Sequence, residues 1–118
     1  MLEFIGSTIK MPRGDTGEIP VWYEDEDTKV KIPLVTGDRV AFTVKRNAND
    51  PDSEAIVQKL VTTFVDGEAI IRIDPADTKL HPFGRYFYDC EIKLADGAVH
   101  TLTPEDAVFK LGKEITHD

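Results

Sequence analysis

Residues 84–102 read GRYFYDCEIKLADGAVHTL, a long alternating run followed by an Asp-Gly pair and a second short run. A two-residue period of apolar and polar side chains is the signature of a β-strand with one buried face. The buried face is predicted to carry Tyr86, Tyr88, Cys90, Ile92 and Leu94. Asp96-Gly97 is a preferred two-residue turn. We therefore expect residues 98–102 to return antiparallel to the long strand and form a β-hairpin.

A second Asp-Gly pair, Asp66-Gly67, separates residues 55–65 from residues 68–73. The later segment is rich in isoleucine and is typical of a strand. The earlier segment is ambiguous, because its apolar side chains recur about every four residues and also fit an amphipathic helix. Its valines and threonines, together with the turn that follows, favour a strand. We therefore predict a second hairpin, closed at Asp66-Gly67.

Shorter strand-like runs fill most of the remaining sequence and alternate with turns rich in Gly, Pro and Asp. They lie at residues 4–11, 19–23, 29–33, 39–45 and 107–115, and the connection at 74–80 allows one helical turn. About eight short strands, with turn signals about every 8–12 residues, are typical of sandwiches and small barrels. We predict one domain over residues 1–118: an all-β, immunoglobulin-like antiparallel β-sandwich. A jelly roll or a small barrel is the alternative.

The chain of 118 residues carries 14 Lys and Arg against 22 Asp and Glu, a formal net charge of −8. A negatively charged domain repels phosphate backbones, so we expect no nucleic-acid partner. No apolar run approaches the roughly 20 residues that span a bilayer, and we expect no membrane association. The N-terminal residues lack the pattern of a secretory signal. The single Cys90 cannot form an internal disulfide, which suits a reducing cytosol.

The sequence contains no recognisable catalytic or metal-binding motif. The histidines, His81, His100 and His117, lack the spacing of a transition-metal site, and there is no Cys-x-x-Cys pair. Cys90 falls on the predicted apolar face, so a buried and inert cysteine is favoured over a nucleophile. We therefore predict that the protein is not an enzyme and that it has no catalytic residue, no cofactor and no metal site.

Three aromatic residues, Trp22, Tyr23 and Phe87, are predicted to point away from the core and to form the interaction surface. Exposed aromatic side chains on a β-surface suit contacts with proteins or sugars, and unpaired edge strands offer a second binding route. Two acidic loops, residues 24–27 and 47–54, supply oxygen ligands of the kind calcium accepts, although their spacing matches no EF-hand. A carbohydrate- or ligand-binding sandwich, assisted by calcium, is therefore one function to weigh.

Several short motifs resemble, in their order, a recurrent module of tailed-phage and prophage proteins. They are RGDTG at 13–17, TGDRVAFTVK at 36–45, IDPADT at 73–78, GRYFYD at 84–89 and FKL at 109–111. The chain is similar to the N-terminal domain of upper baseplate proteins and to small phage structural proteins of β-sandwich form. Baseplate proteins of that kind usually continue into a long helical or receptor-facing region, whereas this sequence stops at Asp118.

The resemblance implies a non-enzymatic structural or assembly role in a phage or prophage particle. The expected partners are other tail or baseplate proteins, met through protein–protein contacts, and the chain is expected to form homo-oligomers. The expected location is the virion, assembled in the cytoplasm of the bacterial host. The motifs are mostly turn and core signatures, so the resemblance assigns no individual binding residue.

Overall fold

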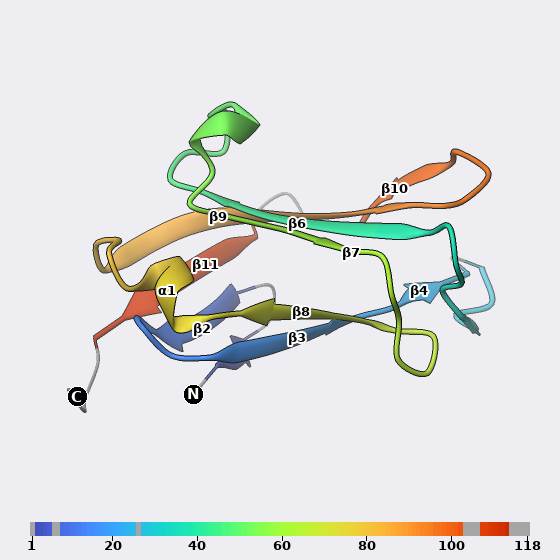
Figure 1. Cartoon of the computed structure of the whole chain (residues 1–118), viewed down its shortest axis with the longest axis horizontal. Coiled ribbons are helices and arrows are strands. Elements are labelled where there is room, and N and C mark those ends of the chain that lie inside the picture. The colour runs from blue at the N-terminus through green and yellow to red at the C-terminus, as the bar shows by residue number, and fades with distance from the viewer. Residues whose placement is uncertain (1, 6–7, 26, 103–106, 114–118) are drawn as a thin grey trace.

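The computed structural model describes residues 2–5, 8–25, 27–102 and 107–113. Within them the chain forms eleven strands and two short helical elements (Figure 1). The strands are β1 (Glu3–Ile5), β2 (Thr8–Pro12), β3 (Gly17–Val21), β4 (Tyr23–Glu24), β5 (Lys31–Ile32), β6 (Arg39–Lys45), β7 (Val57–Val61), β8 (Ala69–Ile73), β9 (Gly84–Lys93), β10 (Val99–Thr101) and β11 (Val108–Gly112). The helical elements are a 3-10 turn at Asp52–Glu54 and the α-helix α1 (Pro75–Thr78). Neither has the length and hydropathy of a membrane span.

Seven strands form one large sheet in the order β1-β2-β11-β9-β6-β7, with β10 also paired to β9. β9 is the longest strand and organises the sheet. One of its edges pairs with β6 over residues 87–93. The opposite edge is shared, because β11 pairs with residues 84–87 and β10 with residues 91–93. The pairs described in this sheet are antiparallel except β2 with β11, which run parallel.

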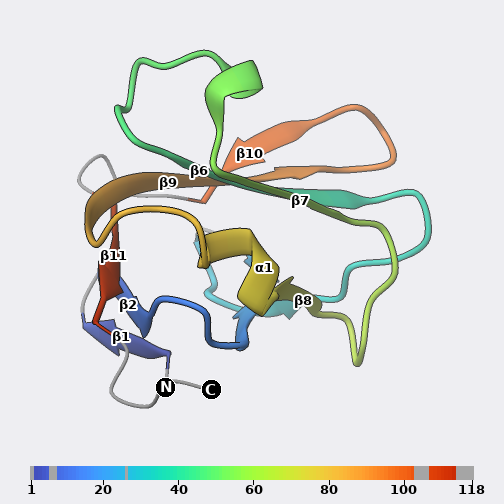
Figure 2. The ribbon, with the colours of Figure 1, turned by 60° about the vertical axis from the view of Figure 1, so that its left-hand side comes forward.

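Two small ribbons form the other layer: β3 pairs with β8, and β4 pairs with β5. Figure 2 shows β9 and β6 on one side of the molecule and β3 and β8 on the other. Apolar side chains from both layers fill the space between them. The largest fully buried ones include Phe42, Phe109, Met11, Ile71, Ile73 and Ile92. The prediction of an all-β sandwich is confirmed, with layers more unequal than the four and three strands of an immunoglobulin constant domain.

The hairpin predicted at residues 84–102 is confirmed. Val99 lies opposite Lys93 in the β9–β10 pair, and the Leu94 N–H donates to the Ala98 carbonyl at 2.8 Å. The predicted buried face is also confirmed. Tyr86, Cys90 and Ile92 are buried, and Tyr88 and Leu94 are partly buried against the core.

The turn at Asp66-Gly67 forms, but the prediction of a hairpin there is wrong beyond the turn itself. Asp66 and Gly67 have φ angles of 52° and 78°, as a type I′ turn requires. Val65 and Glu68 exchange two backbone hydrogen bonds of 2.9 and 3.0 Å. β7 then pairs with β6, whereas β8 pairs with β3. The turn reverses the chain locally, and the flanking strands find their hydrogen-bond partners in different layers.

The prediction of one strand at residues 4–11 is also wrong. β1 and β2 are separate strands that pair antiparallel, with Glu3 opposite Lys10. The connecting residues 6–7 lie outside the described part of the chain. Their sequence, Gly-Ser, is a common turn composition and is the signal that the single-strand interpretation overlooked. Residues 57–61 form a strand, so the choice of strand over helix in that segment is confirmed.

A buried carboxylate fastens the start of β6 to the end of β9. Asp38, which precedes β6, is only 5% exposed. Its Oδ2 accepts a hydrogen bond from the Val35 N–H at 2.8 Å, and its Oδ1 accepts one from the Ala95 N–H at 2.9 Å. One side chain therefore satisfies backbone donors in two loops that are distant in sequence. This arrangement holds the loop before β6 against the loop after β9.

Gly67→Ala is expected to destabilise the protein more than Gly97→Ala, although both glycines have positive φ, 78° and 95°. An alanine at either position adds about 1–2 kcal/mol of backbone strain. A Cβ on Gly67 would also lie 2.9 Å from Pro33 Cβ and 3.0 Å from its Cα, whereas one on Gly97 would meet nothing within 4 Å. Overpacking of this kind adds about 1–3 kcal/mol. Urea denaturation of both variants measures the difference, and equal losses would contradict the close contact with Pro33.

Candidate functional site

A cleft of about 560 Å³ is lined by residues of β4 and β10. These two strands lie at the same end of the molecule (Figure 1). One group of lining residues is 22–25, and the other is 99–102, with Lys29 beside them. Each group is a run of four consecutive residues, so the cleft follows two strand segments. Its volume falls within the range of about 300–1,000 Å³ found for small-ligand sites.

Tyr23 and His100 meet in this cleft from opposite layers. The Tyr23 hydroxyl lies 3.3 Å from His100 Nε2, and the two ring centroids are 5.0 Å apart. Both residues are half-buried. The neighbouring Trp22 is 43% exposed, and its Nε1 donates a hydrogen bond to Glu24 Oε1 at 3.0 Å. The cleft therefore combines a pair of packed rings with one indole that remains open to a ligand.

Asp25 organises the loop between β4 and β5. Its Oδ1 accepts hydrogen bonds from the N–H groups of Thr28 and Asp27, both at 2.9 Å. These bonds hold the pKa of the Asp25 carboxyl below its ordinary value of 3.8, with Thr28 contributing most. The carboxyl groups of Glu24 and Asp25 border the cleft, and Lys29 lies beside them.

A smaller apolar slot of about 210 Å³ adjoins the cleft, since Trp22 and Leu102 line both. Cys90 lines this slot and is 6% exposed, so the prediction of a buried cysteine is confirmed. Burial raises the pKa of the Cys90 thiol to about 12, with a smaller contribution from Asp89. A thiol that stays protonated at neutral pH is a poor nucleophile.

The structure separates the three predicted interaction residues. Trp22 and Tyr23 lie together in the cleft. Phe87 is half-buried and lines a different hollow of about 170 Å³ with Lys45 and Ala107. The cleft also contains His100, which was not among the three predicted interaction residues. Alternation marks residues 98–102 as a strand, but nothing in the sequence places His100 against Tyr23, from which it is separated by 77 positions.

The acidic loops weighed as calcium sites use several of their oxygens internally. Asp50 Oδ2 accepts a hydrogen bond from the Asn47 N–H at 3.1 Å, and Asp52 pairs with Lys45 Nζ at 2.7 Å. Among the described residues, no three His, Cys, Asp or Glu side chains are grouped so that they could hold a metal ion. Glu26, part of the loop at 24–27, lies outside the described residues.

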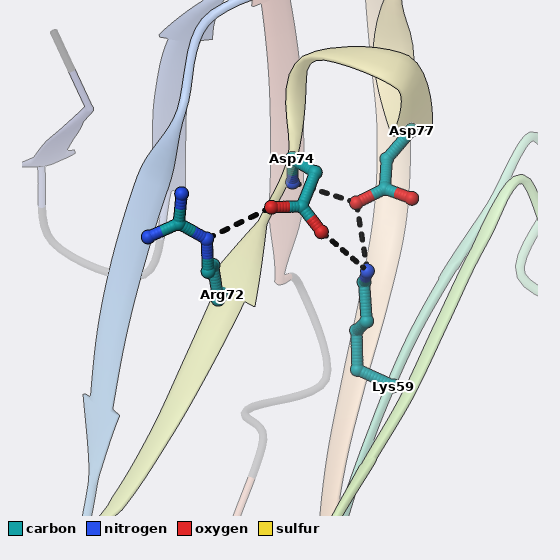
Figure 3. Close-up of polar contacts among 4 residues, drawn as sticks. All are labelled: Lys59, Arg72, Asp74 and Asp77. Carbon is teal, nitrogen blue, oxygen red and sulfur yellow. Dashed lines mark hydrogen bonds and ion pairs between the residues drawn. The ribbon is translucent and has the colours of Figure 1, made fainter.

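The densest group of charges lies away from the cleft, where β7 and β8 approach α1 (Figure 3). Lys59 Nζ lies 2.8 Å from Asp77 Oδ2 and 3.5 Å from Asp74 Oδ2. Arg72 Nε donates to Asp74 Oδ1 at 2.8 Å, and Asp77 Oδ2 also accepts the Asp74 N–H at 2.7 Å. Each carboxylate in the group faces a cation. The cluster links β7, in the large sheet, to β8 and α1. We therefore interpret it as a structural link between these elements.

Asp74→Asn is expected to lower Tm at pH 7, and its difference from the wild type should shrink as pH falls below about 4. The hydrogen bond from Arg72 holds the pKa of Asp74 below its ordinary value of 3.8, against a smaller effect of burial and with help from Lys59. A lowered pKa means that this stabilisation is present above the unfolded-state value and is lost as pH falls through the folded-state value. Melting curves from pH 2 to 7 test this, and a constant difference would contradict it.

Most of the large exposed apolar residues in the described chain belong to segments at the end of the molecule that carries the cleft. The β4–β5 ribbon, the Asp66-Gly67 turn and β10 all lie at that end of the molecule (Figure 1). The backbone joins them, since the Leu34 N–H donates to the Gly67 carbonyl at 3.0 Å. Seven of the ten large exposed apolar residues in the described chain belong to these segments and their flanks: Trp22, Val30, Ile32, Val35, Val65, Val99 and Leu102. We refer to these seven residues as the apolar end.

Comparison of the sequence with protein-family models and with curated proteins finds no match. The cleft and the apolar end are therefore interpreted from their own chemistry.

Proposed function

We propose that this chain is a non-enzymatic assembly module that binds another protein through its apolar end. The observation that carries this proposal is the concentration of exposed apolar side chains around one aromatic cleft. Single exposed apolar residues are normal on a protein surface, but a concentrated group rimmed by polar residues is typical of an interaction site. Trp and Tyr are enriched at the energetic centres of protein interfaces, and Trp22 and Tyr23 both line the cleft.

The chemistry of the site supports binding over catalysis. Cys90 has a raised thiol pKa, and the Lys59–Asp74–Asp77 cluster is paired within itself. The Tyr23–His100 contact lacks a described carboxylate that would orient the imidazole, as a catalytic base usually requires. The aromatic rings and apolar side chains of the site instead offer surface for contact with another protein.

The proposed setting is a phage or prophage particle, with tail or baseplate proteins as partners and the virion as the location. Support for this setting is the resemblance of motifs such as those at 13–17, 36–45 and 84–89 to upper baseplate proteins. Self-association into a homo-oligomer is part of the proposal, because tail and baseplate components usually assemble with symmetry. The partner of the apolar end is then a different tail or baseplate protein.

A second candidate is a sugar or other ring-shaped polar ligand in the cleft. The exposed Trp22 indole favours it, since an open aromatic face stacks on apolar ring surfaces. Glu24 and Asp25 supply hydrogen-bond acceptors beside the indole. This candidate accounts for the cleft but not for Val30, Val35 and Val65, which are exposed outside it.

Trp22→Ala is expected to weaken binding to the tail or baseplate partner by about tenfold or more, since truncating a central interface Trp typically removes at least about 2 kcal/mol. The measurement is co-expression with phage tail and baseplate proteins, followed by mass determination of the complex and titration of its parts. Leu80→Ala is the matched control, because Leu80 is 89% exposed and lies outside the apolar end.

A complex that forms equally well with Trp22→Ala would contradict the use of the apolar end. A chain that forms no complex with any of those proteins would contradict the assembly role. The wild-type protein contains one tryptophan, so Trp22 fluorescence also reports a sugar titration directly. A saturable fluorescence change with a monosaccharide panel, without any protein complex, would favour the second candidate.

A further inference from the structure

We infer that β10 accepts an extended segment of the partner protein as an additional strand, with apolar side chains of that segment entering the cleft beside β4. This inference rests on the proposed assembly function and names the mode of binding and the chemistry of the partner. Addition of a strand to an open sheet edge is a common form of peptide recognition, in which main-chain hydrogen bonds give affinity and pockets for alternate side chains give specificity.

The first argument is the direction of the β10 backbone groups. The Ala98 carbonyl accepts from the Leu94 N–H, and the Leu102 N–H donates to the Cys90 carbonyl, both at 2.8 Å. In an antiparallel pair, hydrogen-bonded positions alternate along the strand. Residues 98, 100 and 102 therefore face β9, and the N–H and C=O groups of Val99 and Thr101 point to the outer edge. Among the described strands, β10 pairs with β9 alone.

The second argument is that this strand borders the cleft. All three β10 residues and the following Leu102 line it, and residues 22–25 line it from the other layer. An extended segment paired with β10 would place every second side chain on the face that carries the cleft. Val99 is 52% exposed and Leu102 is 37% exposed, so apolar surface beside the strand would be covered by such a segment.

The third argument is charge, which selects the partner segment. Trp22 bonds only Oε1 of Glu24, and the loop N–H groups bond only Oδ1 of Asp25. Both carboxyl groups also border the cleft that the segment would enter. The chain as a whole carries a formal charge of −8. An extended segment that alternates apolar and basic side chains is complementary to this site, whereas a second copy of the same acidic surface is not.

The far edge of the large sheet offers a contrast. β7 is the last strand on that side, and it carries Lys59, whose charge is directed to Asp74 and Asp77. A lysine on an edge strand is one of the features by which proteins discourage further strand pairing. β10 contains no Asp, Glu, Lys or Arg, and its sequence, Val-His-Thr, is compatible with pairing.

The test uses the full chain and the hexapeptide acetyl-Lys-Val-Lys-Val-Lys-Val-amide as the probe. Amide NMR should show slower hydrogen exchange and shifted resonances at Val99 and Thr101, with half-saturation near or below about 1 mM, as for weak transient contacts. The same peptide with Glu in place of Lys should bind at least about tenfold more weakly. A peptide methylated on every backbone nitrogen, which removes the N–H donors from both of its edges, should not protect these amides.

Thr101→Pro removes the N–H that points outward and leaves the hydrogen bonds to β9 in place, as proline on an edge strand allows. It is expected to weaken peptide binding by about tenfold, while the matched Thr101→Val variant, which keeps the N–H, should bind like the wild type. If Thr101→Pro unfolds, the methylated peptide still supplies the test. Equal binding of the methylated and unmethylated peptides, or no response at Val99 and Thr101, would overturn the inference, as would binding of monosaccharides in the absence of peptide binding.

The outcomes also distinguish this inference from the proposed function. Tail-protein complexes that form equally well with Thr101→Pro and with the wild type would overturn strand addition and leave the assembly role standing. Peptide binding at β10 without any tail-protein complex would support strand addition and overturn the phage setting.

Discussion

Phe42→Ala is expected to lower the free energy of unfolding by about 3–5 kcal/mol, the usual effect of removing a buried aromatic ring. Phe42 lies in β6, between β9 and β7, and is 1% exposed. Its ring centroid is 5.7 Å from that of Tyr88 and 6.5 Å from that of Phe109. Three strands of the large sheet, β6, β9 and β11, therefore meet at this side chain, and its loss leaves a cavity that neighbouring backbone cannot close.

Chemical denaturation followed by circular dichroism measures this effect, and Tm should fall by at least about 10 °C for a domain of this size. Phe42→Leu is a graded control, because it retains most of the volume and should lose less. Leu80→Ala should change the free energy of unfolding by no more than about 0.5 kcal/mol, since Leu80 is 89% exposed. A Phe42→Ala loss no larger than that of Phe42→Leu would show that the ring does not fill the core as described.

Asp38→Ala is expected to lower the free energy of unfolding by about 2–4 kcal/mol, because it leaves two backbone donors without their acceptor. The carboxylate accepts from the Val35 and Ala95 N–H groups and is 5% exposed, so water has little access to replace it. Asp38→Asn should lose less than Asp38→Ala, since an amide keeps one acceptor oxygen and turns its NH₂ group toward the other donor.

Asp96→Ala is the matched control for Asp38→Ala. Asp96 also accepts a backbone N–H, from Ala98 at 2.9 Å, but in an exposed turn where water can take its place. Its removal should lower the free energy of unfolding by about 1 kcal/mol or less. Urea denaturation gives both values, and similar losses for the two aspartates would contradict the role assigned to Asp38. Faster hydrogen exchange at the Val35 and Ala95 amides in Asp38→Ala would locate the change.

Local patterns predict the strands well where one face is buried. The alternation in residues 84–94 correctly separates the buried Tyr86, Cys90 and Ile92 from their more exposed neighbours, because the period of a strand is a local property. Pairing is not local. Asp66-Gly67 predicts the turn but not the separation of β7 and β8 into different layers, since that depends on which distant strands satisfy their backbone groups. Long-range competition of this kind decides sheet topology.

For the candidate site, too, local features could be predicted from the sequence and long-range contacts could not. Trp22 and Tyr23 could be singled out from composition, as aromatic residues beside an acidic loop. The cleft itself could not, because it depends on β10 returning from β9 to lie near β4. Phe87 is half-buried, and the hollow that it lines lies apart from the cleft. A residue's face can be predicted from periodicity, whereas its neighbours across layers cannot.

The parallel pairing of β2 with β11 has a consequence for how the protein is made. Thr8 lies beside Val108, so two strands from nearly opposite ends of the chain share one ladder. During synthesis from the N-terminus, β2 remains without this neighbour until residues 108–112 have emerged from the ribosome. Contacts between such distant residues slow folding, and an unpaired strand edge in the meantime is open to aggregation. The domain is therefore expected to fold after its synthesis rather than progressively during it.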